Sequence, residues 1–150
     1  MTDRELMQAA IALAREAAAD GEVPVGAVVA KDGEIVSVGR NRREKDKNAL
    51  AHAEIEAIDK ACRALGGWRL WQCELFVTLE PCPMCAGAII NSRIKRVVFG
   101  AYDPKAGSCG SINNLFDFPY NHSPEIEGGF MQDECALILK RFFSDLRKTK

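Results

Sequence analysis

Four residues in the middle of the chain have side chains that can bind a metal ion and move a proton. His52 and Glu54 stand in the run His-Ala-Glu, and Cys82 and Cys85 lie in the run Pro-Cys-Pro-Met-Cys. Imidazole and thiolate groups are common ligands of zinc, which binds them in tetrahedral geometry. Three protein ligands leave the fourth position to water, which is typical of a catalytic site. We therefore predict that His52, Cys82 and Cys85 bind zinc and that Glu54 acts as acid and base.

The order and spacing of these residues match the signature of zinc-dependent nucleobase deaminases, His-x-Glu followed by Pro-Cys-x-x-Cys. Cys82 and Cys85 are three residues apart, so both sulfurs lie on one face if they begin a helix. Zinc lowers the pKa of a bound water towards about 7, which yields a hydroxide that can attack an amine-bearing ring carbon. We predict that Glu54 takes a proton from the water, passes it to a ring nitrogen and later to the departing ammonia.

A Cys-x-x-Cys pair also occurs in structural zinc sites and in redox-active disulfides. A structural site needs a fourth ligand, which could come from His122 or from one of the remaining cysteines, Cys62, Cys73, Cys109 and Cys135. The presence of Glu54 at the position of the acid and base favours the catalytic interpretation. We expect the remaining cysteines to be packing or surface thiols, since a small apolar side chain is the usual role of a buried cysteine.

The segments around the motif predict alternating helices and strands. Apolar residues recur at helical spacing in some segments and form short β-branched runs in others. We expect helices over 2–19, 52–65, 83–90 and 132–148, and strands over 23–30, 34–39, 74–78, 95–100 and, at an edge, 125–127. Phe143 and Leu146 are expected to be buried on the last helix. This order predicts an α/β fold, a three-layer α-β-α sandwich with one mixed central sheet.

Length and composition predict one domain over residues 1–150. Of the 150 residues, 47% are hydrophobic, and the net charge is −1, which excludes a strongly basic nucleic-acid-binding domain but not a local basic rim. Basic residues cluster, as solvated surface or as such a rim, at Arg93, Lys95, Arg96, Lys140, Arg141, Arg147, Lys148 and Lys150. Because no apolar run is long enough to cross a bilayer and the charged N-terminus lacks a signal-peptide region, we expect a cytoplasmic protein.

From about Leu6 to Phe143 the sequence resembles bacterial tRNA-specific adenosine deaminases. The resemblance is carried by the segments 22–28, 51–54, 77–82, 84–89 and 97–101, and by Asp103, Lys105, Gly107, Asn121, His122 and 133–135. It implies a cytidine-deaminase-like fold, a single CMP/dCMP-type zinc deaminase domain, and a homodimer with one zinc ion per subunit. The implied reaction is hydrolytic deamination of the wobble adenosine, tRNA position 34, to inosine in the anticodon loop, with His52, Cys82 and Cys85 as zinc ligands and Glu54 as proton shuttle.

The resemblance also implies substrate contacts at Asn41, Asp103, Tyr120, Asn121 and His122. The Asn41 amide can donate to and accept from a purine edge or a sugar hydroxyl. Asp103 can accept a hydrogen bond from a ribose hydroxyl, and Tyr120 can stack on an unpaired base. Each has a structural alternative: Asn41 as a turn asparagine, Asp103 as a loop cap, and Tyr120 as a packing residue within its loop.

Two other functions remain open. A deaminase of a free purine base such as guanine, or of another nucleobase, would share the four motif residues but resembles this chain less well at 23–26, at 78–80 and around Asp103. A module that binds zinc or RNA without catalysis would not need Glu54, so its presence favours an enzyme. Activity on a stem-loop compared with a free base distinguishes the first two functions.

Overall fold

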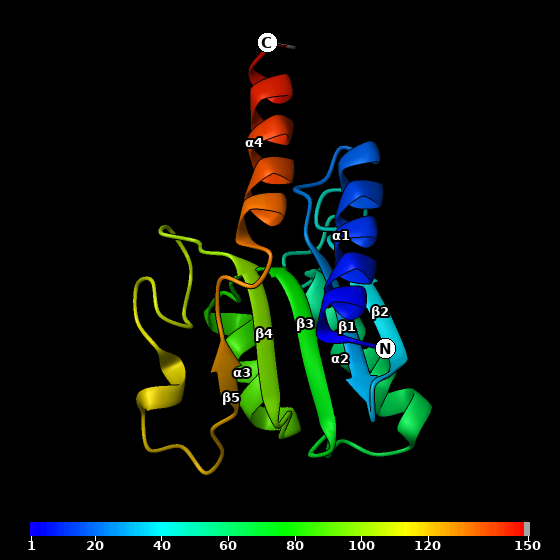
Figure 1. Ribbon diagram of the computed structural model, residues 1–150, viewed down its shortest axis with the longest axis vertical. Helices are drawn as coiled ribbons and strands as arrows, with labels where there is room; N and C mark the ends of the chain where they lie inside the picture. Colours follow the sequence, from blue (N-terminus) through cyan, green and yellow to red (C-terminus); the bar gives the residue numbers. More distant parts are fainter. Residues whose placement is uncertain (149–150) are drawn as a thin grey trace.

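Five strands form one mixed sheet, in the order β2-β1-β3-β4-β5, in the computed structural model, which describes residues 1–148 (Figure 1). The strands are β1 (Gly26–Lys31), β2 (Glu34–Arg40), β3 (Cys73–Leu79), β4 (Arg96–Ala101) and β5 (Glu125–Glu127). β1 pairs antiparallel with β2 and β3, whereas β3, β4 and β5 run parallel. The helices are α1 (Asp3–Ala19), α2 (Ala53–Leu65), α3 (Pro83–Ser92) and α4 (Gln132–Lys148), with a 3₁₀ turn at Leu115–Asp117. The predicted α/β architecture is confirmed.

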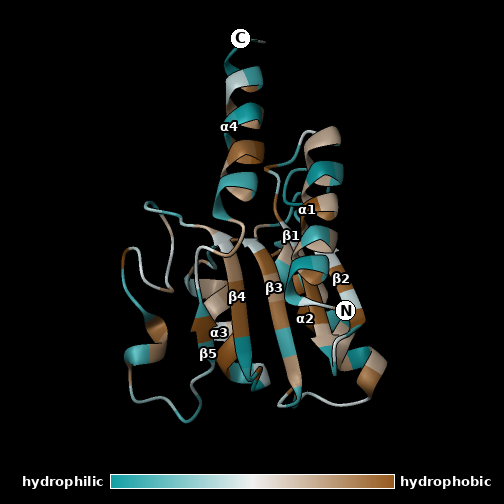
Figure 2. Cartoon of the chain, in the orientation of Figure 1, coloured by the Kyte–Doolittle hydropathy of each residue, from teal (hydrophilic) through white to brown (hydrophobic). Residues whose placement is uncertain are grey.

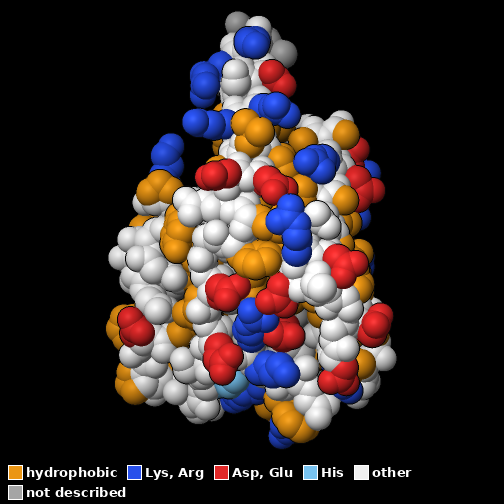
Figure 3. All heavy atoms as spheres, in the orientation of Figure 1, with side chains coloured by type: hydrophobic (Ala, Val, Ile, Leu, Met, Phe, Trp, Pro, Cys, Tyr) orange, Lys and Arg blue, Asp and Glu red, His pale blue; other side chains and the backbone are white. Residues whose placement is uncertain are grey.

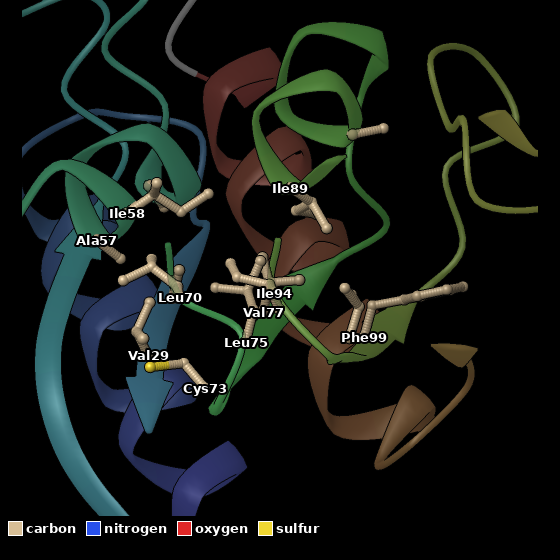
Figure 4. Packing of buried hydrophobic residues seen from close by; sticks show 14 of the residues in the cluster. Val29, Ala57, Ile58, Leu70, Cys73, Leu75, Val77, Ile89, Ile94 and Phe99 are labelled. Atoms are coloured by element: carbon tan, nitrogen blue, oxygen red, sulfur yellow. The ribbon is translucent and has the colours of Figure 1, made fainter. Parts of the chain in front are cut away.

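Successive residues of the central strands point to opposite faces of the sheet, which explains the two layers of helices. Val29 and Val77 pack in a cluster with α2 and α3, whereas the neighbouring Val28 and Phe76 pack in a second cluster with α1 and α4. Both faces are covered, so the strands are apolar along most of their length (Figure 2). Figure 4 shows the first cluster, in which side chains of α2 and α3 meet those of β1, β3 and β4.

Local sequence signals explain several boundaries of these elements. Thr2 caps α1 in a reciprocal capping box with Glu5, as the spacing predicts. Asp32 and Gly33 have positive φ angles of 52° and 76°, the conformation that favours Asp-Gly in a two-residue hairpin between β1 and β2. Gly66 ends α2 in the left-handed conformation.

The start of the predicted strand at 23–30 is wrong by three residues, because β1 begins at Gly26. Pro24 has no N–H for a ladder, and the N–H of Val25 donates instead to the carbonyl of Val23 (3.0 Å). This local turn takes Val23 and Val25 out of the sheet and into the wall of a cavity described below.

The predicted burial of Phe143 and Leu146 is also wrong. Their exposed fractions are 40% and 43%. α4 extends well beyond the edge of the sheet, so its C-terminal half has no sheet to cover (Figure 1). Lys and Arg side chains gather over this end of the molecule (Figure 3), while Lys150 lies outside the described residues. Within residues 1–148, no helix combines the length and apolar character required to cross a membrane.

Gly39 allows α2 to lie directly against β2. A Cβ atom at this position would overlap the carbonyl oxygen of Ala53, in the first turn of the helix. Since His52 and Glu54 are part of the same turn, the absence of a side chain at Gly39 contributes to the placement of both motif residues.

We predict that Gly39→Ala lowers the free energy of unfolding by about 1–3 kcal/mol, because the added methyl group must push α2 away from the sheet. Urea denaturation measures the change. Gly67→Ala is the matched control: a Cβ at Gly67 meets nothing within 4 Å, so its effect should stay within about 0.5 kcal/mol. Equal stabilities of the two variants would contradict this packing account.

Candidate functional site

The N-termini of α2 and α3 meet near the end of β3. His52 is the residue immediately before α2 (φ −83°, ψ 153°), and Cys82 is immediately before α3 (φ −76°, ψ 174°). Pro83 then occupies the first turn of α3, where a missing N–H costs no helical hydrogen bond. Neither the His52 nor the Cys82 side chain caps its own helix, so both are available to a shared site.

The geometry of the three predicted ligands fits a tetrahedral metal ion. Nδ1 of His52 lies 3.6 Å from Sγ of Cys82 and 3.5 Å from Sγ of Cys85, and the ligand atoms all lie within 4.8 Å of one another. Bond lengths of about 2.3 Å to sulfur and 2.0–2.1 Å to nitrogen place tetrahedral ligands about 3.5 Å apart. Among residues 1–148, this group of possible metal ligands has three members, as in a catalytic rather than a structural site.

The side chain of Cys82 forms hydrogen bonds with those of Cys85 and His52. Hydrogen bonds from the Cys85 thiol and from His52 lower the pKa of Cys82 to about 4. The same bond to Cys82, together with burial, raises the pKa of Cys85. Cys82 is thus a thiolate at neutral pH, which is the form of cysteine that binds a metal. Binding of a metal would release the remaining proton from Cys85.

Glu54 lies in the first turn of α2, close to the ligand group. Its exposed fraction is 4%. Burial raises the pKa of Glu54 to about 7, and the negative charge of Cys82 adds to this increase. A carboxyl group with a pKa near neutrality can both accept and release a proton at physiological pH.

His52, Glu54 and Cys82 line a cavity of about 230 Å³, whereas Cys85 is fully buried behind this lining. This volume is below the roughly 300–1,000 Å³ of pockets for drug-sized ligands and therefore suits a small group such as a single base. The cavity joins His52, Glu54 and Cys82 to residues from loops on either side; the other lining residues are Val23, Val25, Asn41, Arg43, Ala53, Leu79, Glu80, Asp103 and Ala106.

Asn41 and Asp103 both line this cavity, but their side chains also hold their own loops. The Asn41 amide donates to the carbonyl of Val23 (3.1 Å) and accepts from the N–H of Arg43 (3.2 Å). Oδ1 of Asp103 accepts from the N–H groups of Lys105 (3.0 Å) and Ala106 (3.2 Å), which makes it a loop cap. The amide and the second carboxylate oxygen can still form further hydrogen bonds to a ligand.

Tyr120, Asn121 and His122 do not line this cavity. His122 Nε2 donates to the carbonyl oxygen of Ile94 (2.6 Å), just before β4 begins and therefore at the end of the sheet away from Cys82. Tyr120 is 55% exposed, with its ring 6.3 Å from that of Phe118. The structure therefore separates these three residues from the metal ligands, Asn41 and Asp103.

Two buried carboxylates near the cavity were not predicted as functional residues. Glu22 accepts from the N–H groups of Glu44 and Lys45, and Glu80 accepts from the loop after β4. Burial raises the pKa of Glu80, but hydrogen bonds from Ser111, Asp103 and Cys109 outweigh this effect and lower it overall. Glu22 shortly precedes the apolar strand β1, and Glu80 directly follows the apolar strand β3. An acidic residue next to the end of an apolar strand is the sequence signal that could have identified both.

The fold and the site define a deaminase, and the chain belongs to the family of MafB19-like deaminases, whose model matches residues 1–147. It is 50% identical over 152 residues to the tRNA-specific adenosine deaminase of Bacillus subtilis strain 168, covering 100% of this chain and 94% of that protein. The family predicted from the sequence is therefore confirmed.

Solved structures agree with this assignment. A structure from studies of A-to-I editing by tRNA:A34 deaminases at the wobble position of transfer RNA superimposes with a TM-score of 0.88 and 43% identity, over 91% of this chain and 99% of that one. The guanine deaminase of Bacillus subtilis superimposes with a TM-score of 0.67 and 33% identity, over 94% of both chains. Both fold and sequence are thus more similar to the tRNA deaminase than to this free-base enzyme.

We predict that the purified protein binds about one zinc ion per chain and that Cys82→Ser loses most of it, because one of three ligands becomes a poor one. Metal analysis after dialysis against a weak chelator measures the content. Cys62→Ser is the matched control, since Cys62 is partly buried on α2 outside the ligand group. A Cys82→Ser protein that retains its zinc would exclude this metal centre.

Proposed function

We propose that this protein is a hydrolase that deaminates the wobble adenosine, position 34, to inosine in a tRNA anticodon loop. The observation that carries the proposal is that Glu54 lines the same cavity as His52 and Cys82, two members of the three-residue group that could hold a metal ion. The similarity to tRNA deaminases in sequence and fold supports RNA rather than a free base as the substrate.

We propose zinc as the metal, one ion per subunit, held by His52 Nδ1 and the sulfurs of Cys82 and Cys85. The spacing of one nitrogen and two sulfurs supports this choice, because zinc binds such mixed sets tetrahedrally. When bound, zinc supplies Lewis-acid activation of a water molecule at neutral pH. The positive ends of the α2 and α3 dipoles favour the thiolate forms of the two cysteines.

Glu54 performs the proton transfers of the reaction. It accepts a proton from the attacking water as the C–O bond forms at C6 of adenine, and delivers this proton to N1 of the ring. It then accepts the second proton of the water and delivers it to the amine as the C–N bond breaks. The products are ammonia and neutral inosine, which has a hydrogen on N1 and a carbonyl at C6. One carboxylate thus acts in turn as base and acid.

The target base must leave the stacked anticodon loop to enter the cavity. We propose that Asn41 binds the base or its sugar and that Asp103 accepts from a ribose hydroxyl, including the 2′-OH that distinguishes RNA from DNA. Tyr120, Asn121 and His122 are the remaining predicted contacts. Because they lie outside the cavity, we propose that they contact RNA beyond the target base.

We further propose a homodimer in the cytoplasm, where tRNA substrates are available. Exposed apolar side chains on and after α2, Leu65 (43%), Trp68 (51%) and Trp71 (61%), support association with another chain, because such groups often mark interfaces.

The proposed function predicts inosine and ammonia from an anticodon stem-loop that carries adenosine at the wobble position. Free adenosine and free guanine, incubated under the same conditions, should remain unchanged. Liquid chromatography of the digested RNA measures inosine directly. Conversion of guanine but not of the stem-loop would replace the proposed substrate with a free purine base and retain the metal centre.

Glu54→Gln should lower the turnover of the stem-loop by about a hundred- to ten-thousand-fold, because the amide cannot accept and return protons. Zinc content should remain that of the wild type, since Glu54 is not a proposed ligand. Asp59→Asn, on the exposed side of the same helix, is the matched control and should retain full turnover. Turnover by Glu54→Gln at the wild-type rate would disprove its role as proton shuttle.

A further inference from the structure

Glu80 is a buried residue directly after β3, and its carboxylate accepts hydrogen bonds from the loop that follows β4. The residue is 2% exposed. Oε1 accepts from the N–H of Asp103 (2.9 Å) and from the hydroxyl of Ser111. Oε2 accepts from the N–H groups of Cys109 (3.0 Å) and Ser111 (3.0 Å). Four donors from the two ends of one loop, residues 103–111, therefore converge on one carboxylate.

The loop encloses this carboxylate closely. A Cβ atom at Gly107 would overlap the carboxylate atoms of Glu80. The N–H of Ser108 also donates to the carbonyl of Pro81 (2.9 Å), in the turn that leads to Cys82. The 103–111 loop is thus bonded to the same short segment of chain that presents a predicted metal ligand.

This attachment determines the position of part of the cavity wall. Asp103 and Ala106, both in the loop, line the cavity together with Glu80 itself. Without the carboxylate, three backbone N–H groups would lose their partner, and unpaired buried donors are costly. The loop would then adopt other conformations, in which Asp103 no longer has a defined distance from Cys82.

We propose that Glu80 is a positioning residue for the RNA substrate: it holds the 103–111 loop so that Asp103 meets the ribose of the target nucleotide. This inference rests on the proposed function. A glutamine at this position would retain one acceptor oxygen, but its NH₂ group would face the N–H donors of the loop. The role of Glu80 therefore depends on a carboxylate with two acceptor oxygens, not merely on a side chain of this size.

Kinetics of Glu80→Gln on the anticodon stem-loop test the proposal. We expect kcat/KM to fall about ten- to a hundred-fold, mainly through a higher KM, with unchanged zinc content, because small displacements of substrate-positioning groups have effects of this size. Glu74→Gln is the matched control: its carboxylate, near the opposite end of β3, pairs with Arg96 (2.9 Å), and its kinetics should be those of the wild type. Wild-type kinetics of Glu80→Gln would overturn the proposal.

A double-mutant cycle with Asp103→Ala separates positioning from a general structural effect. If Glu80 acts through Asp103, the double variant should lose no more kcat/KM than the more damaged single variant. Losses that multiply in the double variant would overturn the proposal, as would an Asp103→Ala variant with wild-type kcat/KM.

Hydrogen exchange provides a readout that does not require turnover. In Glu80→Gln, the amides of residues 103–111 should exchange faster, while those of β3 and β4 keep their wild-type rates. If Glu80→Gln does not fold, Gly107→Ala is the alternative variant, because it displaces the same loop. It should raise KM for the stem-loop, and an unchanged KM would overturn the proposal.

The failure of the proposed function and the failure of this inference can be distinguished. If the wild type fails to deaminate the stem-loop, only the proposed function is contradicted. Unchanged hydrogen exchange of the loop in Glu80→Gln would contradict the inference about Glu80 separately.

Discussion

The meeting of two helix N-termini near the end of β3 is the arrangement on which the rest of the site depends. His52 precedes α2 and Cys82 precedes α3, so the free N–H groups and the positive dipole ends of both helices point towards the same small volume. This environment favours the thiolate form of a cysteine. The same arrangement places Nδ1 of His52 3.5–3.6 Å from the sulfurs of Cys82 and Cys85. The cost of bringing these groups together is offset by burial of the apolar faces of both helices against the sheet, including Ala57 and Ile89.

Two buried carboxylates hold the loops around the cavity by accepting hydrogen bonds from backbone N–H groups. Glu22, just before β1, accepts from the N–H groups of Glu44 (3.0 Å) and Lys45 (2.7 Å) in the loop after β2. Glu80, just after β3, accepts from the loop after β4. Both loops contribute to the cavity wall, and neither is held by a sheet ladder of its own along this wall. Charge-assisted hydrogen bonds are stronger than neutral ones, so one carboxylate can order several residues of otherwise irregular backbone.

Local patterns in the sequence predicted most of the elements, because alternating or helical apolar spacing directly reports which face is buried. The same patterns failed where a single residue or the shape of the whole molecule determines the structure. Pro24 moves the start of β1 to Gly26. α4 extends beyond the edge of the sheet, so Phe143 is exposed. The three candidate metal ligands could be predicted because ligand type and spacing are themselves a chemical requirement, and the structure brings the three residues together. The hydrogen bonds of Glu80 could not be predicted in this way, since its partners are 23, 29 and 31 residues away and only the folded chain brings them together. The positions of Tyr120, Asn121 and His122 depend in the same way on the path of a long loop.

In the proposed reaction, one metal ion and Glu54 act on a base that is held in this cavity. A crystal structure of the protein with zinc and an anticodon stem-loop that carries a non-hydrolysable analogue of the wobble base tests it most directly. Anomalous scattering should locate zinc on His52 Nδ1 and the sulfurs of Cys82 and Cys85, with the analogue between Asn41 and Asp103 and its N1 within hydrogen-bond reach of Glu54. A metal ion bound by other residues, or a wobble base bound outside the cavity, would contradict the account.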